Sequence, residues 1–283
     1  MEIISNQHFE GERPLFERHG LRLENVTVGE GESAVKECSD IEAADCRFWG
    51  KYPFWHVRRF TIERCQFDAG ARSALWYSED LRMRDTRIEG PKMFREMRGI
   101  DFENVVITDA DETFWKCRDI RARNLELHDG TYPFMFCENV FVDGLKSDSK
   151  YVFQYCRNVE IHHADIVTKD SFWECSNVTI FDSTLDGEYL AWHSDNVRLV
   201  RCHLKGEQLL CYAKRLVLEQ CTFDAACDRL FEYSEVDADI IGHVTDIKNP
   251  ATGRITADSV GTVTIDRNIK PPADCKIVVR NRK

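Results

Sequence analysis

Apolar residues recur along the chain with a period of about twenty residues. Each recurrence is followed two positions later by a second apolar residue, and the residue between them is mostly polar. A self-similar period of this length is typical of a solenoid, in which each repeat is one coil and neighbouring coils bury each other's apolar side. Twelve positions define the repeat and serve as its anchors: Leu21, Ile41, Phe60, Leu81, Ile100, Ile120, Val140, Val159, Val178, Val197, Leu216 and Val236.

The spacing within one repeat predicts three short β-strands and leaves no room for a helix. The alternation at the anchor has a period of two, as in a strand with one buried face. A second apolar pair follows five and seven residues after the anchor, as at Cys46 and Phe48, and a third column lies six residues before it, as at Phe114. We therefore predict an all-β fold, a single-stranded right-handed parallel β-helix of about twelve coils with three strands per coil. The leucine consensus of a leucine-rich repeat is absent.

The continuity of the repeat predicts one domain over residues 1–283. A chain with 43% hydrophobic residues can bury a core of this length. We assign residues 15–241 to the coils. The repeat weakens after Val236, where strand-like stretches at Gly261–Asp266 and Lys276–Arg280 alternate with proline and glycine. Because an open end exposes unpaired strands, we expect residues 242–283 to form a C-terminal cap and residues 1–14 an N-terminal cap.

The position before the anchor holds asparagine on four consecutive coils. Asparagine tolerates left-handed backbone, and its side-chain amide can bond the same amide on the next coil. We interpret these residues as a structural ladder rather than as a catalytic set: Asn139, Asn158, Asn177 and Asn196.

Composition excludes several partners. The formal charge of −11 disfavours the nucleic-acid backbone. Residues 1–15 are polar and no stretch resembles a membrane span, so we expect a cytoplasmic protein that binds no membrane. Nine of the twelve cysteines share two columns with small residues, which indicates buried reduced thiols. The side chains of a straight column, such as the one from Cys117 to Cys175, do not converge on one point as zinc ligands must. We therefore expect no metal and no cofactor.

Five strings of the sequence resemble an uncharacterised bacterial family of right-handed β-helix proteins, a domain of unknown function: FEGERPLFE, WGKYPFWHV, ARSALWYSEDL, GPKMFRE and DGEYLAWHSDNV. The likeness covers nearly the whole chain. The wider fold resembles pectate lyases and polygalacturonases, and this resemblance implies action on carbohydrate. The Asn-Thr-Asp, Asp-Asp, Gly-His-Gly and Arg-Ile-Lys set of polygalacturonases is absent, and so is a recognisable calcium-binding aspartate array.

The column five residues before the anchor holds five of the six tryptophans. If the neighbouring phenylalanines point into the coil, alternation turns this column outward and gives an aromatic stripe rimmed by charge. Flat aromatic side chains along a groove suit sugar rings. The alternative is that these side chains also fill the core. The substrate-binding candidates are Trp55, Trp76, Arg95, Trp115, Trp173 and Trp192.

Two clusters of acidic residues and histidine are candidates for catalysis. Asp109 and Asp129 occupy equivalent positions on adjacent coils, beside His128, and two like charges one rung apart should raise one pKa. Glu174 lies beside His193 on the next coil. For both clusters, a solvated acidic turn is the alternative in a chain with 49 acidic residues.

Three classes of function fit these patterns. The first is a hydrolase or lyase acting on an oligo- or polysaccharide along the aromatic face. The second is a non-catalytic glycan-binding scaffold that uses the same face. The third is a structural assembly protein, a homo-oligomer formed through the aromatic face or the C-terminal cap. The enzyme needs a converging acid–base group beside the stripe, whereas binding needs the stripe alone.

Overall fold

The structure, a computed structural model, describes residues 1–266, 268 and 273–280. It is a parallel β-solenoid, a β-helix of about fourteen coils, and the described residues contain no helix. The predicted fold is thus confirmed, although the number of coils exceeds the twelve anchors. The chain divides into two compact units, residues 1–149 (unit 1) and 150–283 (unit 2), which we describe separately.

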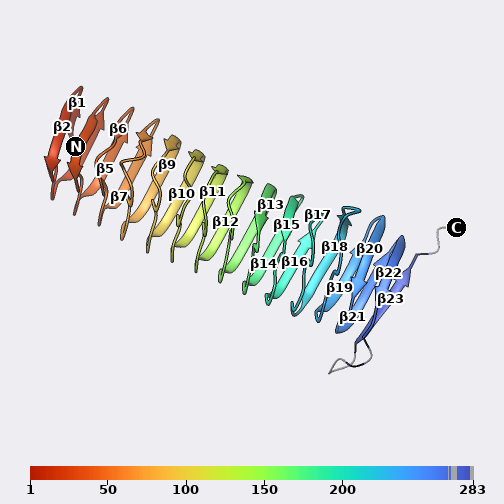
Figure 1. Cartoon of the computed structure of the whole chain (residues 1–283). Coiled ribbons are helices and arrows are strands. Elements are labelled where there is room, and N and C mark those ends of the chain that lie inside the picture. Colours follow the sequence, from red (N-terminus) through yellow and green to blue (C-terminus); the bar gives the residue numbers. More distant parts are fainter. Residues whose placement is uncertain (267, 269–272, 281–283) are drawn as a thin grey trace. The chain divides into compact units, whose positions relative to one another are not determined.

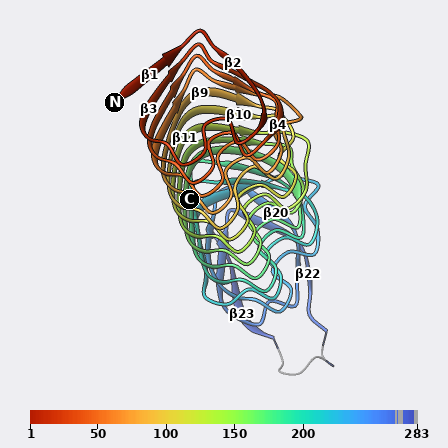
Figure 2. The same ribbon diagram turned by 90° about the vertical axis from the view of Figure 1, so that its left-hand side faces the viewer.

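In unit 1 the anchor strands pair in parallel from one coil to the next (Figure 1). Leu21 pairs with Ile41, Ile41 with Phe60, and the register continues through the following coils to Val140. Figure 2 shows these coils from the N-terminal side. The strands of unit 1 are β1 (Glu2–Ser5), β2 (His8–Glu12), β3 (His19–Glu24), β4 (Thr27–Glu32), β5 (Ser39–Ala44), β6 (Arg47–Phe48), β7 (Arg58–Glu63), β8 (Gln66–Phe67), β9 (Glu79–Ile88), β10 (Arg98–Ile107), β11 (Arg118–Leu127) and β12 (Glu138–Ser147).

Unit 2 repeats this arrangement. Val159 pairs with Val178 and Val178 with Val197, and Leu216 pairs with Val236 further along. The strands of unit 2 are β13 (Arg157–Lys169), β14 (Ser176–Phe181), β15 (Thr184–Glu188), β16 (Asp195–Val200), β17 (His203–Lys205), β18 (Leu216–Phe223), β19 (Glu235–Ile240), β20 (His243–Lys248), β21 (Thr252–Ala257), β22 (Ser259–Thr264) and β23 (Asp274–Val279).

The two terminal segments predicted as caps carry strands of their own. In unit 1, β1 pairs in parallel with β3, and β2 pairs with β4. In unit 2, β21 lies between β19 and β23, and β20 pairs with β22. These strands add coils beyond the first and last anchors, which is why the observed count is higher than twelve.

The third segment of each coil is a tight turn rather than the regular strand predicted for it. In one coil of unit 2, φ is 51° at Asp170, 56° at Phe172 and 49° at Glu174. An extended strand cannot hold left-handed backbone on alternate residues. Isolated bridges join some of these turns, for example Arg95 with Trp115 in unit 1. The apolar column of this segment therefore marks inward side chains and not a strand.

Phenylalanines fill the interior behind these turns. In unit 1 the ring of Phe114 stacks on Phe134 with centroids 4.4 Å apart and on Phe94 at 4.8 Å. Phe231 is also fully buried and packs on Phe223. Counting back from Val236 places Phe231 in the tryptophan column, and this assignment is wrong. The left-handed residues of its turn, Arg229, Phe231 and Tyr233, lie one residue nearer the following anchor than those of other coils, so Phe231 takes the inward position.

Both structural columns expected from the sequence are present. The backbone of Asn139, Asn158, Asn177 and Asn196 is left-handed, with φ of 58°, 56°, 56° and 58°. Eleven of the twelve cysteines are buried and Cys275 is half-buried. In unit 2, the Cys175 thiol donates to the carbonyl of Phe153, and burial raises the pKa of this thiol well above its usual value. The thiols therefore act as small core side chains.

Candidate functional site

The tryptophan column of unit 1 is a stack in which each ring covers the next. The indoles of Trp55 and Trp76 lie nearly parallel, with centroids 5.6 Å apart. The Arg95 guanidinium lies 4.4 Å from the Trp76 centroid and 5.2 Å from that of Trp115. Each of these side chains is half-buried. The ring faces are thus occupied by neighbours in the stack, and the edges reach solvent.

Hydrogen bonds hold this column to the coils. Nε1 of Trp55 donates to the carbonyl of Ser73 at 2.6 Å, and Nε1 of Trp76 to that of Lys92 at the same distance. In unit 2, Trp173 and Trp192 stack at 5.6 Å, and Trp192 Nε1 donates to Gln208 at 2.6 Å. Neighbouring side chains stack on the indoles and backbone carbonyls bind their Nε1 groups, and these contacts indicate a structural role.

The predicted cluster around Asp109 lies in unit 1. His128 contacts two carboxylates, Asp148 through Nδ1 and Glu126 through Nε2, both at 3.1 Å. Burial opposes its charged form, but these hydrogen bonds outweigh burial and raise the pKa of His128. Burial also raises the pKa of Asp109, and the charges of Asp111 and Asp129 add to this effect. The predicted direction is correct, although desolvation contributes more than charge repulsion.

The second predicted cluster, in unit 2, does not form an acid–base pair. Glu174 and His193 are both exposed. Among the described residues, the hydrogen-bond partner of the Glu174 carboxylate is Trp173 Nε1 at 3.4 Å, not His193. The His193 ring instead stacks on Tyr212 at 4.8 Å. Burial raises the pKa of the nearby Asp170.

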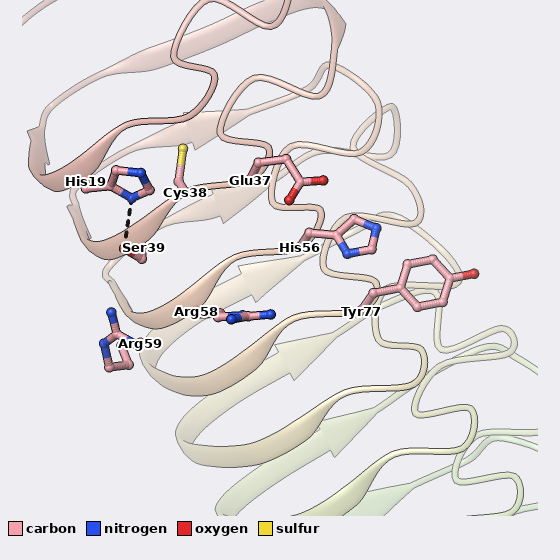
Figure 3. Close-up of a pocket in the computed structure, with 8 residues that line it drawn as sticks. All are labelled: His19, Glu37, Cys38, Ser39, His56, Arg58, Arg59 and Tyr77. Atoms are coloured by element: carbon pink, nitrogen blue, oxygen red, sulfur yellow. Dashed lines mark hydrogen bonds between the residues drawn. The ribbon is translucent and has the colours of Figure 1, made fainter.

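Sequence reasoning missed a polar pocket of about 330 Å³ in unit 1 (Figure 3). One wall is a column of three residues at the same position of successive strands: His19 on β3 pairs in register with Ser39 on β5, and Ser39 with Arg58 on β7. His19 Nδ1 lies 2.9 Å from Ser39 Oγ. Eight residues line this space, which we call the histidine pocket: His19, Glu37, Cys38, Ser39, His56, Arg58, Arg59 and Tyr77.

Two further pockets continue the histidine pocket along the outer face of the anchor strands. One of about 310 Å³ shares Arg59 with it and extends to Arg82 on β9. The next, of about 400 Å³, shares Asp80 and Arg82 and reaches Arg121 on β11. Shared walls make the three pockets one groove, the arginine groove. Its lining beyond the histidine pocket is Phe60, Thr61, Asp80, Leu81, Arg82, Gly99, Ile100, Asp101, Asp119 and Arg121.

Three arginines of this groove form no ion pair with any described residue: Arg58, Arg82 and Arg121. Arg121 does lie over the Phe141 ring, 4.8 Å from its centroid. Most other arginines of unit 1 contact carboxylates, as Arg59 contacts Asp40 at 2.7 Å. The groove therefore presents guanidinium groups that are not held in ion pairs, although Asp80, Asp101 and Asp119 also line it.

One signal in the sequence could have located this surface. Residues 51–100 hold eleven Lys and Arg against seven acids, within a chain whose net charge is −11. The polar residue between the two apolar residues of the anchor strand points outward, and it is arginine at Arg82 and Arg121. The aromatic pattern that predicted a binding face does not include this column of the anchor strand.

Among the described residues, no group of three or more His, Cys, Asp or Glu side chains is arranged to hold a metal ion. Within the same residues, no helix is long and apolar enough to cross a membrane.

Comparison with known proteins identifies the family. Residues 2–278 match the family model described as "Protein of unknown function (DUF3737)". The chain belongs to this family. The match confirms the resemblance to an uncharacterised β-helix family drawn from the sequence. No curated protein matches this DUF3737 chain in sequence.

Solved structures resemble this DUF3737 protein only distantly. The A-module of mannuronan C-5 epimerase AlgE4 from Azotobacter vinelandii is 11% identical, with 98% of this chain and 87% of that chain covered and a TM-score of 0.34. HetL, a pentapeptide repeat protein involved in heterocyst differentiation regulation from the cyanobacterium Nostoc, is 11% identical over 82% and 85% of the two chains, with a TM-score of 0.23. The periplasmic alginate epimerase AlgG is 7% identical, with 98% of this chain and 74% of that chain covered and a TM-score of 0.23. These values are too low to carry a functional argument.

Proposed function

We propose that unit 1 binds an acidic oligosaccharide along the arginine groove and does not transform it. The observation that carries the proposal is the set of cations without ion pairs in one continuous groove, above all Arg82 and Arg121. These residues occupy the same strand position two coils apart, a distance of about 10 Å at the spacing of parallel strands. An extended chain with repeated carboxylates could contact both.

The remaining lining suits a hydroxylated ligand. Asp80, Asp101 and Thr61 place oxygen acceptors between the arginines. Carboxylates accept hydrogen bonds from sugar hydroxyls, while guanidinium groups bind carboxylates through two parallel hydrogen bonds. A neutral sugar would leave the arginines unpaired, and a polyanion without hydroxyls would offer no hydrogen-bond donor to Asp80, whereas Asp101 already pairs with Arg84 at 3.3 Å. An acidic sugar chain satisfies both kinds of group.

The groove lacks the chemistry of a glycosidase. Such an enzyme needs a carboxyl that stays protonated at working pH as general acid. In the groove, the Asn139 amide and the Arg98 guanidinium lower the pKa of Asp119. The carboxyls whose pKa is raised, Asp109 and Asp170, are not among the groove residues. Binding without cleavage is the function this arrangement favours.

Calorimetric titration with oligogalacturonate, and with a neutral cello-oligosaccharide of equal length, tests the proposal. We expect binding of the acidic oligomer alone, weakened by added salt because the groups are exposed. Arg82→Ala should weaken it at least about tenfold, since a charged hydrogen bond is lost. Arg87→Ala is the matched control, because Arg87 is exposed on the same strand β9 but lies outside the groove. Equal affinity for the neutral oligomer would refute the proposal.

A hydrolase centred on Asp109 and His128 is the second candidate, favoured by the raised pKa of both groups. Release of reducing ends from the acidic oligomer would support this activity over simple binding. If Asp109→Asn abolished that release while Arg82→Ala left it intact, the chemistry would belong to the Asp109 cluster and not to the groove.

A further inference from the structure

The histidine pocket differs in chemistry from the rest of the arginine groove. Its first wall presents polar side chains from three successive coils, the column of His19, Ser39 and Arg58. The Ser39 hydroxyl already donates a hydrogen bond to Asp40 at 3.0 Å, so Arg58 is the main donor of this wall. Its other wall is an aromatic ledge, in which the exposed rings of His56 and Tyr77 stack at 5.2 Å. Figure 3 shows the guanidinium of Arg58 extending from the column toward this ledge.

Charge in the pocket is concentrated on one side chain. Arg59 also lines the space, but both arms of its guanidinium contact the Asp40 carboxylate, at 2.7 and 2.8 Å. Arg58 forms no ion pair with any residue that the structure describes. Glu37 is the single acid of the lining. An anion that enters the pocket therefore finds one guanidinium without an ion pair, with the Glu37 carboxylate also in the lining.

The hydrogen bond between His19 and Ser39 does not by itself mark a site. The same pairing of a histidine with a hydroxyl on the next coil occurs at His8 with Thr27, at 2.7 Å, and at His203 with Thr222, at 2.8 Å. It is a recurring contact of this fold. What sets the histidine pocket apart is that Arg58 continues the column and that a second histidine, His56, faces it across the cavity.

We propose that the histidine pocket binds a phosphoryl group carried on a small hydroxylated molecule, such as a sugar phosphate or a phosphorylated chain end. A phosphoryl group carries nearly two negative charges and three terminal oxygens at neutral pH. Three oxygens can meet several donors of the lining at once, such as the Arg58 guanidinium and the His56 ring, whereas a carboxylate has two oxygens in one plane. A volume of about 330 Å³ holds the phosphoryl group and part of its carrier.

Glu37 fits this assignment as a contact for the carrier. Its carboxylate only accepts hydrogen bonds, so it repels phosphoryl oxygens and attracts hydroxyls. This inference deepens the proposed function, since the pocket is one end of the arginine groove, but it rests on different residues.

Titration of the full chain with inorganic phosphate, hexose 6-phosphate and acetate tests the inference. We expect saturable binding of both phosphates, tighter for the hexose phosphate, and acetate at least about tenfold weaker. Arg58→Ala should weaken phosphate binding at least about tenfold. Arg59→Ala is the control within the pocket, with a smaller effect because Asp40 already occupies its guanidinium. His56→Asn should weaken binding without removing it.

The outcomes separate this inference from the proposed function. No phosphate binding by the unmodified protein, or acetate binding equal to that of phosphate, overturns it whatever the variants do. Equal losses in Arg58→Ala and Arg59→Ala also overturn it, because they indicate a general effect of charge. If phosphate binds but oligogalacturonate does not, the proposed function fails and the phosphoryl site stands. A thermal shift of the unmodified protein with phosphate provides a measurement that requires no variant to fold.

Discussion

The side-chain amide of Asn196 donates a hydrogen bond of 2.8 Å to the side-chain oxygen of Asn177, one coil earlier. Asn177 makes the same contact with Asn158 at 3.0 Å. All three have left-handed backbone, so each asparagine both tolerates the bend and bonds its neighbour across it. The four asparagines of this column are thereby explained without any role in catalysis.

Replacing Asn177 should separate these two contributions. Asn177→Ala loses its ladder hydrogen bonds and places in left-handed backbone a residue that tolerates it less well than asparagine does, so we expect the free energy of unfolding to fall by about 1–3 kcal/mol. Asn177→Gly keeps the backbone freedom and should lose less. Chemical denaturation measures both. Equal losses would show that the hydrogen bonds alone matter, and no loss in either variant would contradict the ladder.

The tryptophan stack should contribute more to stability than the exposed row beside it. Trp76→Ala removes a stacked ring, its hydrogen bond to Lys92 and the support of Arg95, so we expect a loss of about 2–3 kcal/mol in unfolding free energy. Tyr77→Ala, on the neighbouring residue with 38% of its surface exposed, should lose about 1 kcal/mol or less. If Trp76→Ala lowered the free energy of unfolding less than Tyr77→Ala, the tryptophan column would again be a candidate for ligand binding.

Stability should depend on pH through His128. Burial opposes the charged form of His128, but the hydrogen bonds that its ring donates to Asp148 and Glu126 outweigh burial and raise its pKa in the folded state. A raised pKa gives stability that is fully present below the unfolded pKa of about 6.5 and is lost as pH rises through the folded value. His128→Gln should therefore be more destabilising at pH 5.5 than at pH 8.5, by up to about 1 kcal/mol for a partly exposed pair.

Denaturation curves at both pH values measure this difference. Asp148→Asn removes one of the two carboxylates and should reduce the same pH dependence. An equal cost of His128→Gln at both pH values would mean that the charged histidine contributes nothing to the folded state.

Native thiol titration should detect about one reactive cysteine. Cys275 alone is half-buried, whereas the other eleven cysteines are buried. Burial raises the pKa of Cys275 to about 11, so reaction at neutral pH should be slow and should speed up as pH rises. Cys275→Ser should abolish this phase. Rapid labelling of several thiols without denaturant would contradict the buried columns.

The repeat predicted the backbone far better than the surface. Anchors such as Leu21 and Ile41 pair in register because the period of apolar residues is the period of the stacked coils. The turn at Phe172 escaped prediction because apolar spacing reports which side chain points inward, not the φ of the residue that carries it. Phe231 shows the same weakness, since its turn lies one residue nearer the following anchor than in other coils, which changes every position counted back from that anchor.

The candidate site was harder to predict for a related reason. Whether Trp76 presents a face or an edge depends on the rings of adjacent coils, and alternation cannot report this. The groove depends on which arginines lack partners, and ion pairs form between residues about twenty positions apart, as Arg59 with Asp40. Charge counts identify a basic segment, but they do not say that Arg58 and Arg82 remain unpaired within it.

Stacking in register also bears on how the protein folds. Nearly every strand contacts partners one coil away, so the loop to be closed for each new coil is about twenty residues wherever in the chain it forms. Folding of such an array is expected to begin at one stable pair of coils and to spread outward, each finished coil serving as the template for the next. Elongating the protein by a coil would then add stability while leaving the slowest step, formation of the first pair, unchanged.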